Sequence, residues 1–359
     1  MRFSICVPVY NVENFIEECV HSILIQTFND FEVIFINDGS TDESLQRLKK
    51  ICQKDKRIKI INKKNEGLLW ARRDAIKIAS GEYVLFIDSD DKYPHEHVLK
   101  YLNDYIQKYN RPDLILFNRL EFSSDGIKNS NPFYNYVKLF EKEDLKEIRY
   151  QFITRNYFNA MFLKCIKREI LQSDDTNYKI HNPQMAEDIA QSIYMFDKSK
   201  SILYIPDVFY LYRINPNSIT NAPLAIDKLE RKMVRKLFSI LLESIEKWGL
   251  QSYKNDVFKK YYEKTYLFYI TRIMELLNSK VDKELISNIV KYNWFNEDNL
   301  FLNNQQTLKQ AKLRRGDHYL ILSIIKKDEK YFLKGYRAKR KDKRILSIKK
   351  YFKRIITRG

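Results

Sequence analysis

The stretch Tyr83-Val84-Leu85-Phe86-Ile87-Asp88-Ser89-Asp90-Asp91 joins an apolar run directly to three carboxylates. The apolar run predicts a buried strand that ends at the acidic cluster. Adjacent like charges repel one another, so the cluster needs a positive partner. A divalent metal, Mn²⁺ or Mg²⁺, would take Asp88, Asp90 and Asp91 as hard oxygen ligands and would usually bind substrate phosphates as well. A solvated acidic turn is the alternative, and the neighbouring sequence has to decide between them.

The first 120 residues alternate strand and helix patterns. Strands are expected at 3–9, 31–36, 58–61, 83–87 and 113–117, and helices at 12–25, 41–52, 68–79 and 95–109. This alternation predicts an α/β fold, in which a mostly parallel sheet is flanked by helices. Ligands of such sheets bind beyond the carboxyl ends of the strands. The loops at 8–11, 37–40 and 88–91 should therefore converge at one edge.

After residue 120 the alternation stops. Residues 122–135 predict a loop or hairpin, and a helical C-terminal region follows, interrupted by two short strands at 202–205 and 208–212. The aromatic residues of 226–278 are better explained by core packing than by ligand stacking. We therefore expect four parts, at 1–120, 121–222, 223–335 and 336–359.

Positive charge is concentrated near the C-terminus. The net charge is +18, yet residues 1–120 carry 18 basic and 18 acidic residues, whereas 326–359 carry 15 basic and 3 acidic ones. Apolar residues recur at helical spacing within 343–356, which predicts a cationic amphipathic helix. Such a tail suits an anionic membrane surface. A solvated helix, a protein partner and nucleic acid are the alternatives.

The expected location is the cytoplasm, with the protein peripheral on the inner face of the membrane. The apolar run at 319–325 is far shorter than the roughly 20 residues that a membrane span requires. Pro8 interrupts the N-terminal apolar run too early for a signal peptide. The four cysteines show no paired spacing, so we expect neither disulfides nor a zinc site.

The loops at the expected edge carry side chains that suit a nucleotide. Asp38 could accept a hydrogen bond from a base, with Gly39 allowing close approach, although a helix-capping turn explains both residues too. Tyr10 could stack on a base or simply pack. The sequence lacks Gly-x-Gly-x-x-Gly and Gly-x-x-x-x-Gly-Lys, which argues against dehydrogenases and P-loop enzymes.

Six segments in order resemble the motif series of glycosyltransferase family 2. They are Pro8-Val9-Tyr10-Asn11, Gln26-Thr27, Asp38-Gly39-Ser40-Thr41-Asp42, Asn65-Glu66-Gly67-Leu68 with Ala71-Arg72, Gly81-Glu82-Tyr83 and Asp88-Ser89-Asp90-Asp91. The resemblance covers residues 1 to about 220. It implies a GT-A fold, a nucleotide-sugar donor, a divalent metal at the Asp-x-Asp element and inversion at the anomeric carbon. Residues 1–120 would then bind the nucleotide sugar, and 121–222 would form the acceptor-side half.

The same resemblance implies roles for individual residues. Pro8, Tyr10 and Asp38 would contact the nucleotide, Arg72 would approach the diphosphate, and Asp88 and Asp90 would handle ribose, phosphate and metal. Asn11, Asn65 and Ser89 complete the predicted nucleotide-sugar site. The sequence departs from the family pattern at Asn37, which replaces an Asp, and at Arg73 and Ala75, which replace Asn and Gly.

An inverting transfer requires a base, because the attacking hydroxyl must lose its proton. Met185-Ala186-Glu187-Asp188 resembles the acidic pair that supplies it, so we expect Asp188 to be the base, with Glu187 as its substitute. Acids that simply favour a helix N-terminus are the alternative. Arg213 could pair with the leaving diphosphate or form a surface ion pair.

The expected function is a metal-dependent inverting glycosyltransferase. It would move a sugar from a nucleotide-diphosphate donor, most often a UDP-sugar, to a hydroxyl of a glycan or lipid-linked acceptor in cell-surface polysaccharide or glycolipid synthesis. A nucleotidyl- or phosphotransferase on a similar sheet would lack the acceptor-side base. A basic nucleic-acid-binding protein would show steep salt dependence, and the leading hypothesis expects no nucleic-acid partner.

Overall fold

The computed structural model describes residues 1–53, 55–124, 126–128, 132–154, 158–176, 178, 187–214, 243–253, 330–331, 333–335 and 337–338. The chain divides into two compact units, one made of 1–222 with 240–249 and the other of 223–239 with 250–359. Nearly all of the described structure belongs to the first unit. The predicted tail helix at 343–356 lies outside the described residues.

The first unit is built on one sheet with the strand order β3-β2-β1-β4-β8-β5-β9-β7, to which β6 is added by pairing with β5. Its first half is parallel and consists of β1 (Phe3–Val9), β2 (Phe31–Asp38), β3 (Ile58–Lys63) and β4 (Tyr83–Phe86). Every residue of β1, β2 and β4 is buried, as expected for strands covered on both faces. The predicted α/β class is confirmed.

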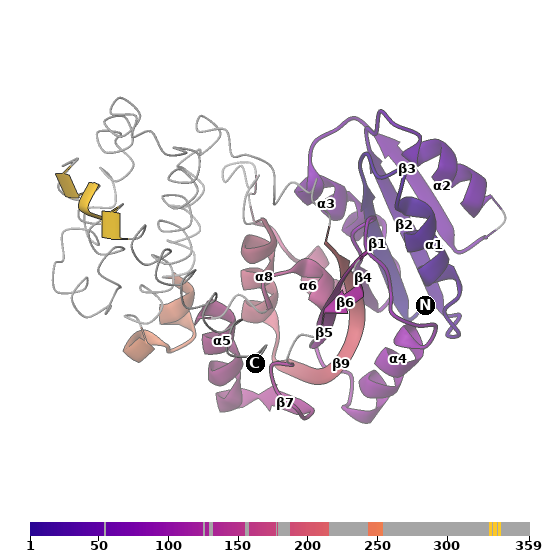
Figure 1. Ribbon diagram of the computed structural model, residues 1–359. Helices are drawn as coiled ribbons and strands as arrows, with labels where there is room; N and C mark the ends of the chain where they lie inside the picture. Colours follow the sequence, from indigo (N-terminus) through magenta and orange to yellow (C-terminus); the bar gives the residue numbers. More distant parts are fainter. Residues whose placement is uncertain are drawn as a thin grey trace, which may run out of the picture. The chain divides into compact units, whose positions relative to one another are not determined.

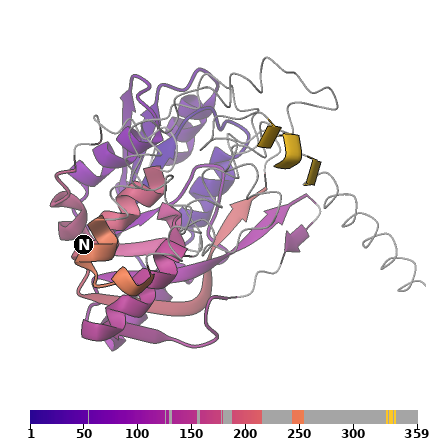
Figure 2. The ribbon, with the colours of Figure 1, turned by 90° about the vertical axis from the view of Figure 1, so that its left-hand side faces the viewer.

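Helices connect these strands and flank the sheet (Figures 1 and 2). They are α1 (Ile16–Leu24), α2 (Ser44–Cys52), α3 (Leu68–Ile78) and α4 (Val98–Lys108). The first two begin later than predicted because side chains hold the preceding loops outside the helices. Ser44 Oγ accepts a hydrogen bond from Val12 N at 2.8 Å, and Asp42 accepts one from Glu13 N at 3.0 Å.

The second half of the sheet is mixed, whereas the first 120 residues predicted a mostly parallel sheet. β8 (Lys164–Lys167) lies antiparallel between β4 and β5 (Leu114–Ser123), and β7 (Lys138–Glu141) is antiparallel to β9 (Ser201–Arg213). The sequence analysis missed β7 and β8, since strands of four residues show little periodicity. The two strands expected at 202–205 and 208–212 are one strand, β9, which runs parallel to β5 through a register shift.

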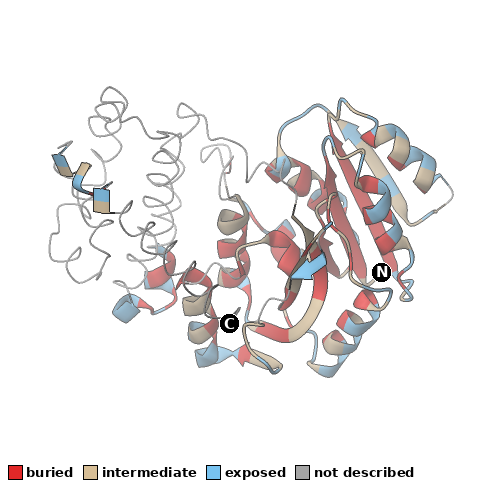
Figure 3. Ribbon diagram, viewed as in Figure 1, coloured by how far each residue is buried: buried red, intermediate tan, exposed pale blue. Residues whose placement is uncertain are grey.

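Several short elements follow along the chain. β6 (Gly126–Lys128) pairs with the end of β5, so the expected hairpin is confirmed. Further helices include α5 (Leu145–Thr154), α6 (Arg168–Gln172), α8 (Glu187–Lys198) and the 3-10 turns η1 (Lys142–Asp144), η3 (Met161–Leu163) and η5 (Gln251–Tyr253). Buried residues gather on the strands and on the helix faces that cover them (Figure 3). All four cysteines are free and buried. Within the described residues, no helix is both long and apolar enough to span a membrane.

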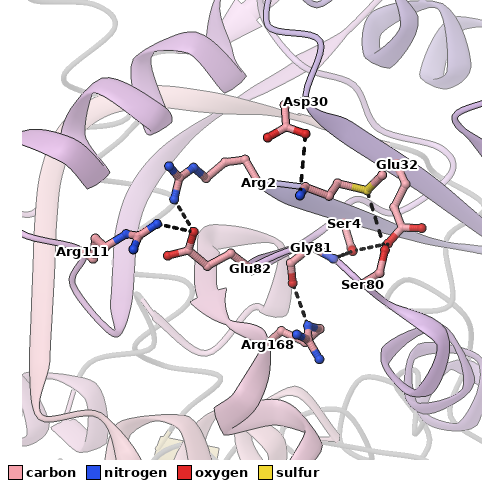
Figure 4. Close-up of polar contacts among 10 residues, drawn as sticks. Arg2, Ser4, Asp30, Glu32, Ser80, Gly81, Glu82, Arg111 and Arg168 are labelled. Carbon is pink, nitrogen blue, oxygen red and sulfur yellow. Dashed lines mark hydrogen bonds and ion pairs between the residues drawn. The ribbon is translucent and has the colours of Figure 1, made fainter.

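A buried polar network holds the opposite, amino-terminal edge of the parallel strands (Figure 4). Glu32 is 2% exposed and accepts hydrogen bonds from the hydroxyls of Ser4 and Ser80, both at 2.6 Å. Burial alone would raise the pKa of Glu32, but these bonds and an ion pair with Lys59 lower it to about 2. A Cβ on Gly81 would lie 2.5 Å from the backbone nitrogen of Ser4, so this approach requires glycine. The Gly81 motif therefore stabilises the sheet, away from the predicted site.

Candidate active site

The carboxyl ends of β1, β2 and β4 bring the three predicted loops to one edge. Val9 pairs with Asn37 across β1 and β2, and Ile87 N donates to Cys6 O at 3.2 Å, which keeps the end of β4 beside β1. Asn11 has a φ of 50° and accepts a hydrogen bond from Thr41 N at 2.8 Å. These contacts tie the loops at 8–11, 37–40 and 88–91 together, as the strand pattern predicted.

The predicted nucleotide side of this edge contains one exposed aromatic ring, Tyr10, which is 47% exposed. Pro8 is buried in β1. Asp38 is buried too, and it accepts hydrogen bonds from the backbone N–H groups of Glu66 at 2.9 Å and Gly67 at 2.7 Å. Asp38 therefore anchors the start of α3, and its contact with a base stays a prediction.

The close approach expected at Gly39 is made to protein backbone. Gly39 has a φ of 73°, and a Cβ there would lie 2.8 Å from the backbone nitrogen of Asn65. Beside it, Asn37 donates to Asn62 Oδ1 at 2.6 Å, while its own Oδ1 is buried and has no partner among the described residues. Asn37 is thus a polar group at the nucleotide edge that the sequence analysis noted only as a departure from the family pattern.

Asp91 is held entirely by the protein. The Tyr210 hydroxyl donates to one of its carboxylate oxygens and Arg213 N donates to the other, each at 2.6 Å. Burial, together with the charges of Asp90 and Asp88, raises the pKa of Asp91 to about 8. Asp91 therefore fastens the acidic turn to β9, and its role as a metal ligand stays a prediction.

Arg72 joins the two predicted halves of the site. Its side chain is 1% exposed; one terminal nitrogen donates to Asp88 Oδ1 at 2.9 Å, and the other donates to Asp188 Oδ1. Asp88 follows β4, whereas Asp188 lies in the first turn of α8. Within the described part of the chain, no protein group bonds the second oxygen of either carboxylate, and the two side chains are 24% and 25% exposed. Each therefore keeps one oxygen available for a ligand.

The acidic cluster is short of positive charge. Burial raises the pKa of Asp88 although Arg72 opposes the shift, and burial with the charge of Asp88 raises the pKa of Asp90. Burial and the neighbouring Asp188 likewise raise the pKa of Glu187. The described residues contain no group of three or more His, Cys, Asp or Glu side chains able to hold a metal alone. The set fits a metal that takes one or two carboxylates and completes its shell with phosphates and water.

Arg213 and Ser89 lie close to the turn. Arg213 Nε donates to the backbone oxygen of Asp90 at 2.7 Å, and its guanidinium forms an ion pair with Glu18 of α1. Of the two alternatives at Arg213, the structure thus contains the ion pair, and contact with a diphosphate stays a prediction. Ser89 is buried. Its contact with the nucleotide sugar also stays a prediction.

Arg73, which departs from the family pattern, forms contacts that the sequence did not predict. It donates to Asp174 Oδ2 at 2.8 Å and to the backbone oxygen of Asp174 at 2.6 Å. Tyr178 donates to the same carboxylate at 2.7 Å. Arg73 therefore holds the segment after α6. Lys164, a lone lysine in the apolar run at 161–166, is completely buried near the site, and the sequence analysis missed it as well.

Comparison with known proteins agrees with this geometry. The sequence profile of glycosyl transferase family 2 matches residues 4–171. The chain is 30% identical over 230 residues to the glycosyltransferase GlyG of Streptococcus pneumoniae, and the match covers 60% of this chain and 72% of GlyG. The chain belongs to glycosyltransferase family 2.

Two further relatives of the family are longer than their match. Identity is 32% over 221 residues with the uncharacterized glycosyltransferase EpsJ of Bacillus subtilis, covering 61% of this chain and 63% of EpsJ. Identity is 37% over 223 residues with a poly(ribitol-phosphate) beta-glucosyltransferase of Bacillus spizizenii, and this match covers 60% of this chain and 32% of that protein. The chain thus spans less than two thirds of the length of these two proteins.

The fold has a solved counterpart. The structure of TarS 1–349 from Staphylococcus aureus in complex with UDP-GlcNAc superposes with a TM-score of 0.66 at 22% identity. The match covers 92% of this chain and 90% of that one. The predicted GT-A-like fold is therefore confirmed.

Proposed function

We propose that this protein is a metal-dependent, inverting glycosyltransferase that uses a nucleotide-diphosphate sugar, most simply a UDP-sugar. The observation that carries the proposal is the guanidinium of Arg72, which bonds Asp88 on the donor side and Asp188 on the acceptor side. The two carboxylates belong to separate elements, since Asp88 follows β4 and Asp188 begins α8. A transferase, by contrast, needs a donor diphosphate and an acceptor base close together.

On the donor side, the nucleotide would lie over the loops that follow β1 and β2. Tyr10 offers an exposed ring for the base, and Asn37 Oδ1, which has no partner among the described residues, offers an acceptor beside it. Asp90 and the second oxygen of Asp88 would hold a divalent metal, which when bound would neutralise charge on the diphosphate. Arg72 would supply a fixed positive charge beneath the same group.

On the acceptor side, Asp188 would act as the base. Its Oδ1 is bonded by Arg72, so Oδ2 would accept the proton of the attacking hydroxyl. The hydroxyl oxygen would bond to the anomeric carbon as the bond between that carbon and the diphosphate breaks. Glu187, whose pKa is raised by burial and by Asp188, would be the substitute base. Attack from the face opposite the diphosphate would invert the anomeric centre.

The acceptor would be a hydroxyl of a surface glycan, of a lipid-linked glycan or of a polyol-phosphate polymer. The relative described as a poly(ribitol-phosphate) beta-glucosyltransferase and the UDP-GlcNAc complex of TarS support this class of acceptor and donor. The basic tail at 336–359 would place the enzyme on an anionic membrane surface beside such an acceptor. We retain the proposed division into a donor half at 1–120 and an acceptor half at 121–222.

The test is release of nucleoside diphosphate from a panel of UDP-, GDP-, CDP- and dTDP-sugars with Mn²⁺ present. At least one donor should be turned over by the wild type, and turnover should fall on addition of EDTA and in Asp90→Ala. A nucleotidyltransferase would instead transfer the nucleoside monophosphate group and release sugar 1-phosphate. A phosphotransferase would transfer the sugar phosphate and release nucleoside monophosphate. Both would tolerate Asp188→Asn. Failure of every donor, or full activity of Asp188→Asn, would rule the proposal out.

A further inference from the structure

A lysine is completely buried beside the proposed site. The Lys164 side chain is 0% exposed at the start of β8, between β4 and β5. Its ammonium donates to the backbone oxygens of Phe158 and Ala160, each at 2.6 Å, and to that of Asn159 at 3.3 Å. An ammonium has three protons, so these carbonyls satisfy it completely. Burying such a charge is costly, which makes an apolar residue the simpler choice for packing alone.

The same carbonyls are connected to the helix that carries Asp188. Ser192 is buried in α8 and donates from Oγ to the backbone oxygen of Asn159 at 2.9 Å. Ser192 and Asp188 are four residues apart on one helix and therefore lie on the same face. The carbonyl of Asn159 thus links β8, through Lys164, to the first turns of α8.

Lys164 also belongs to the charge cluster of the site. The charges near it are Arg72 from α3 and Asp188 from α8, with Asp88 after β4 and Glu187 joined to them through Arg72. Burial lowers the pKa of Lys164 to about 7; Asp188 opposes that shift and Arg72 adds to it. Asp188 therefore interacts electrostatically with both Lys164 and Arg72, and Arg72 also bonds it directly.

We propose that Lys164 is a positioning residue for the acceptor-side base. It holds the carbonyls of residues 158–160 against β8, fixes the start of α8 through Ser192 and places a positive charge behind Asp188. The kinetic consequences of this inference rest on the proposed function. Its structural consequence, a rigid start of α8, is independent of that function.

The test compares Lys164→Met with Lys167→Met, a matched control on the same strand whose ammonium pairs with Asp113 at 2.7 Å. Lys164→Met should lower kcat about 100-fold, because a small misplacement of a base is that costly, and leave the donor KM within about threefold. The acidic limb of its pH profile should move to higher pH. Lys164→Arg should recover part of kcat, and Lys167→Met should resemble wild type.

Hydrogen exchange supplies a readout that needs no activity. Amides of residues 188–192 should exchange faster in Lys164→Met than in Lys167→Met. If Lys164→Met does not fold, Ser192→Ala should show the same changes in smaller measure. Unchanged exchange in these amides would overturn the inference, and so would an active wild type whose Lys164→Met and Ser192→Ala variants keep its kcat and pH profile. A wild type that turns over no donor would instead refute the proposed function.

Discussion

Replacing Arg72 with lysine keeps the positive charge of this residue and removes its ability to form two hydrogen bonds in different directions. The guanidinium reaches Asp88 with one nitrogen and Asp188 with the other. A lysine ammonium keeps the positive charge, but it is a single point and cannot bond both carboxylates across the site. The variant should therefore fold, but Asp88 and Asp188 should no longer be held in a fixed position relative to each other.

The expected size of this effect follows from the hydrogen bond that is lost. A hydrogen bond to a charged group contributes about 1.5–3 kcal/mol, and each ~1.4 kcal/mol changes a rate tenfold. Losing one of the two bonds should lower kcat/KM by about 10- to 150-fold. Arg72→Met should do more, because it leaves two partly buried carboxylates without a partner and should destabilise the fold by about 3–5 kcal/mol.

The assay is continuous detection of nucleoside diphosphate from the donor that the panel identifies. Thermal unfolding of each variant should be measured in parallel. The control is Arg57→Lys, because Arg57 forms an ion pair with Asp55 away from the site. A double-mutant cycle with Asp188→Asn should show strong coupling, since the two residues act as one unit. Activity of Arg72→Lys within twofold of wild type, or additive effects in the cycle, would refute the reasoning.

Three further predictions concern the sheet edges. Glu32→Gln should lower the free energy of unfolding at pH 7 by about 3 kcal/mol. Because the folded pKa of Glu32 is lowered to about 2, this contribution is present above about pH 4.5 and lost as the pH falls toward 2, so urea titrations of wild type and variant should converge there. Gly81→Ala should destabilise by several kcal/mol in the same assay, since its Cβ would clash with Ser4 N. Asp91→Ala should lower the melting temperature, whereas Asp90→Ala should leave it unchanged and abolish stimulation by Mn²⁺.

The edge that carries the site could be predicted because strand and helix patterns alternate clearly in the first 120 residues. Parallel strands put their carboxyl ends together, so the loops with Tyr10, Asp38 and Asp88 had to meet. The partners of individual side chains could not be predicted in this way. Asp38 and Asp91 are occupied by backbone donors and by Tyr210. Local sequence does not reveal which donors a folded chain will bring to a carboxylate.

The second half was harder for a related reason. β8 has four residues and two lysines, so its pattern resembles a loop as much as a strand. Without β8, the burial of Lys164 and its bonds to residues 158–160 could not be foreseen. The pairing of Arg72 with Asp188 likewise joins residues 116 positions apart, which no periodicity encodes.

The central claim is that the carboxyl edge of the sheet binds a nucleotide sugar through Asp88 and Asp90. Calorimetric titration of UDP into the wild type and Asp90→Ala, each with and without Mn²⁺, tests it most directly. We predict binding to the wild type that strengthens at least tenfold with Mn²⁺, and no such strengthening in Asp90→Ala. The absence of binding by UDP, GDP, CDP and dTDP, or Mn²⁺ strengthening that persists in Asp90→Ala, would contradict the claim.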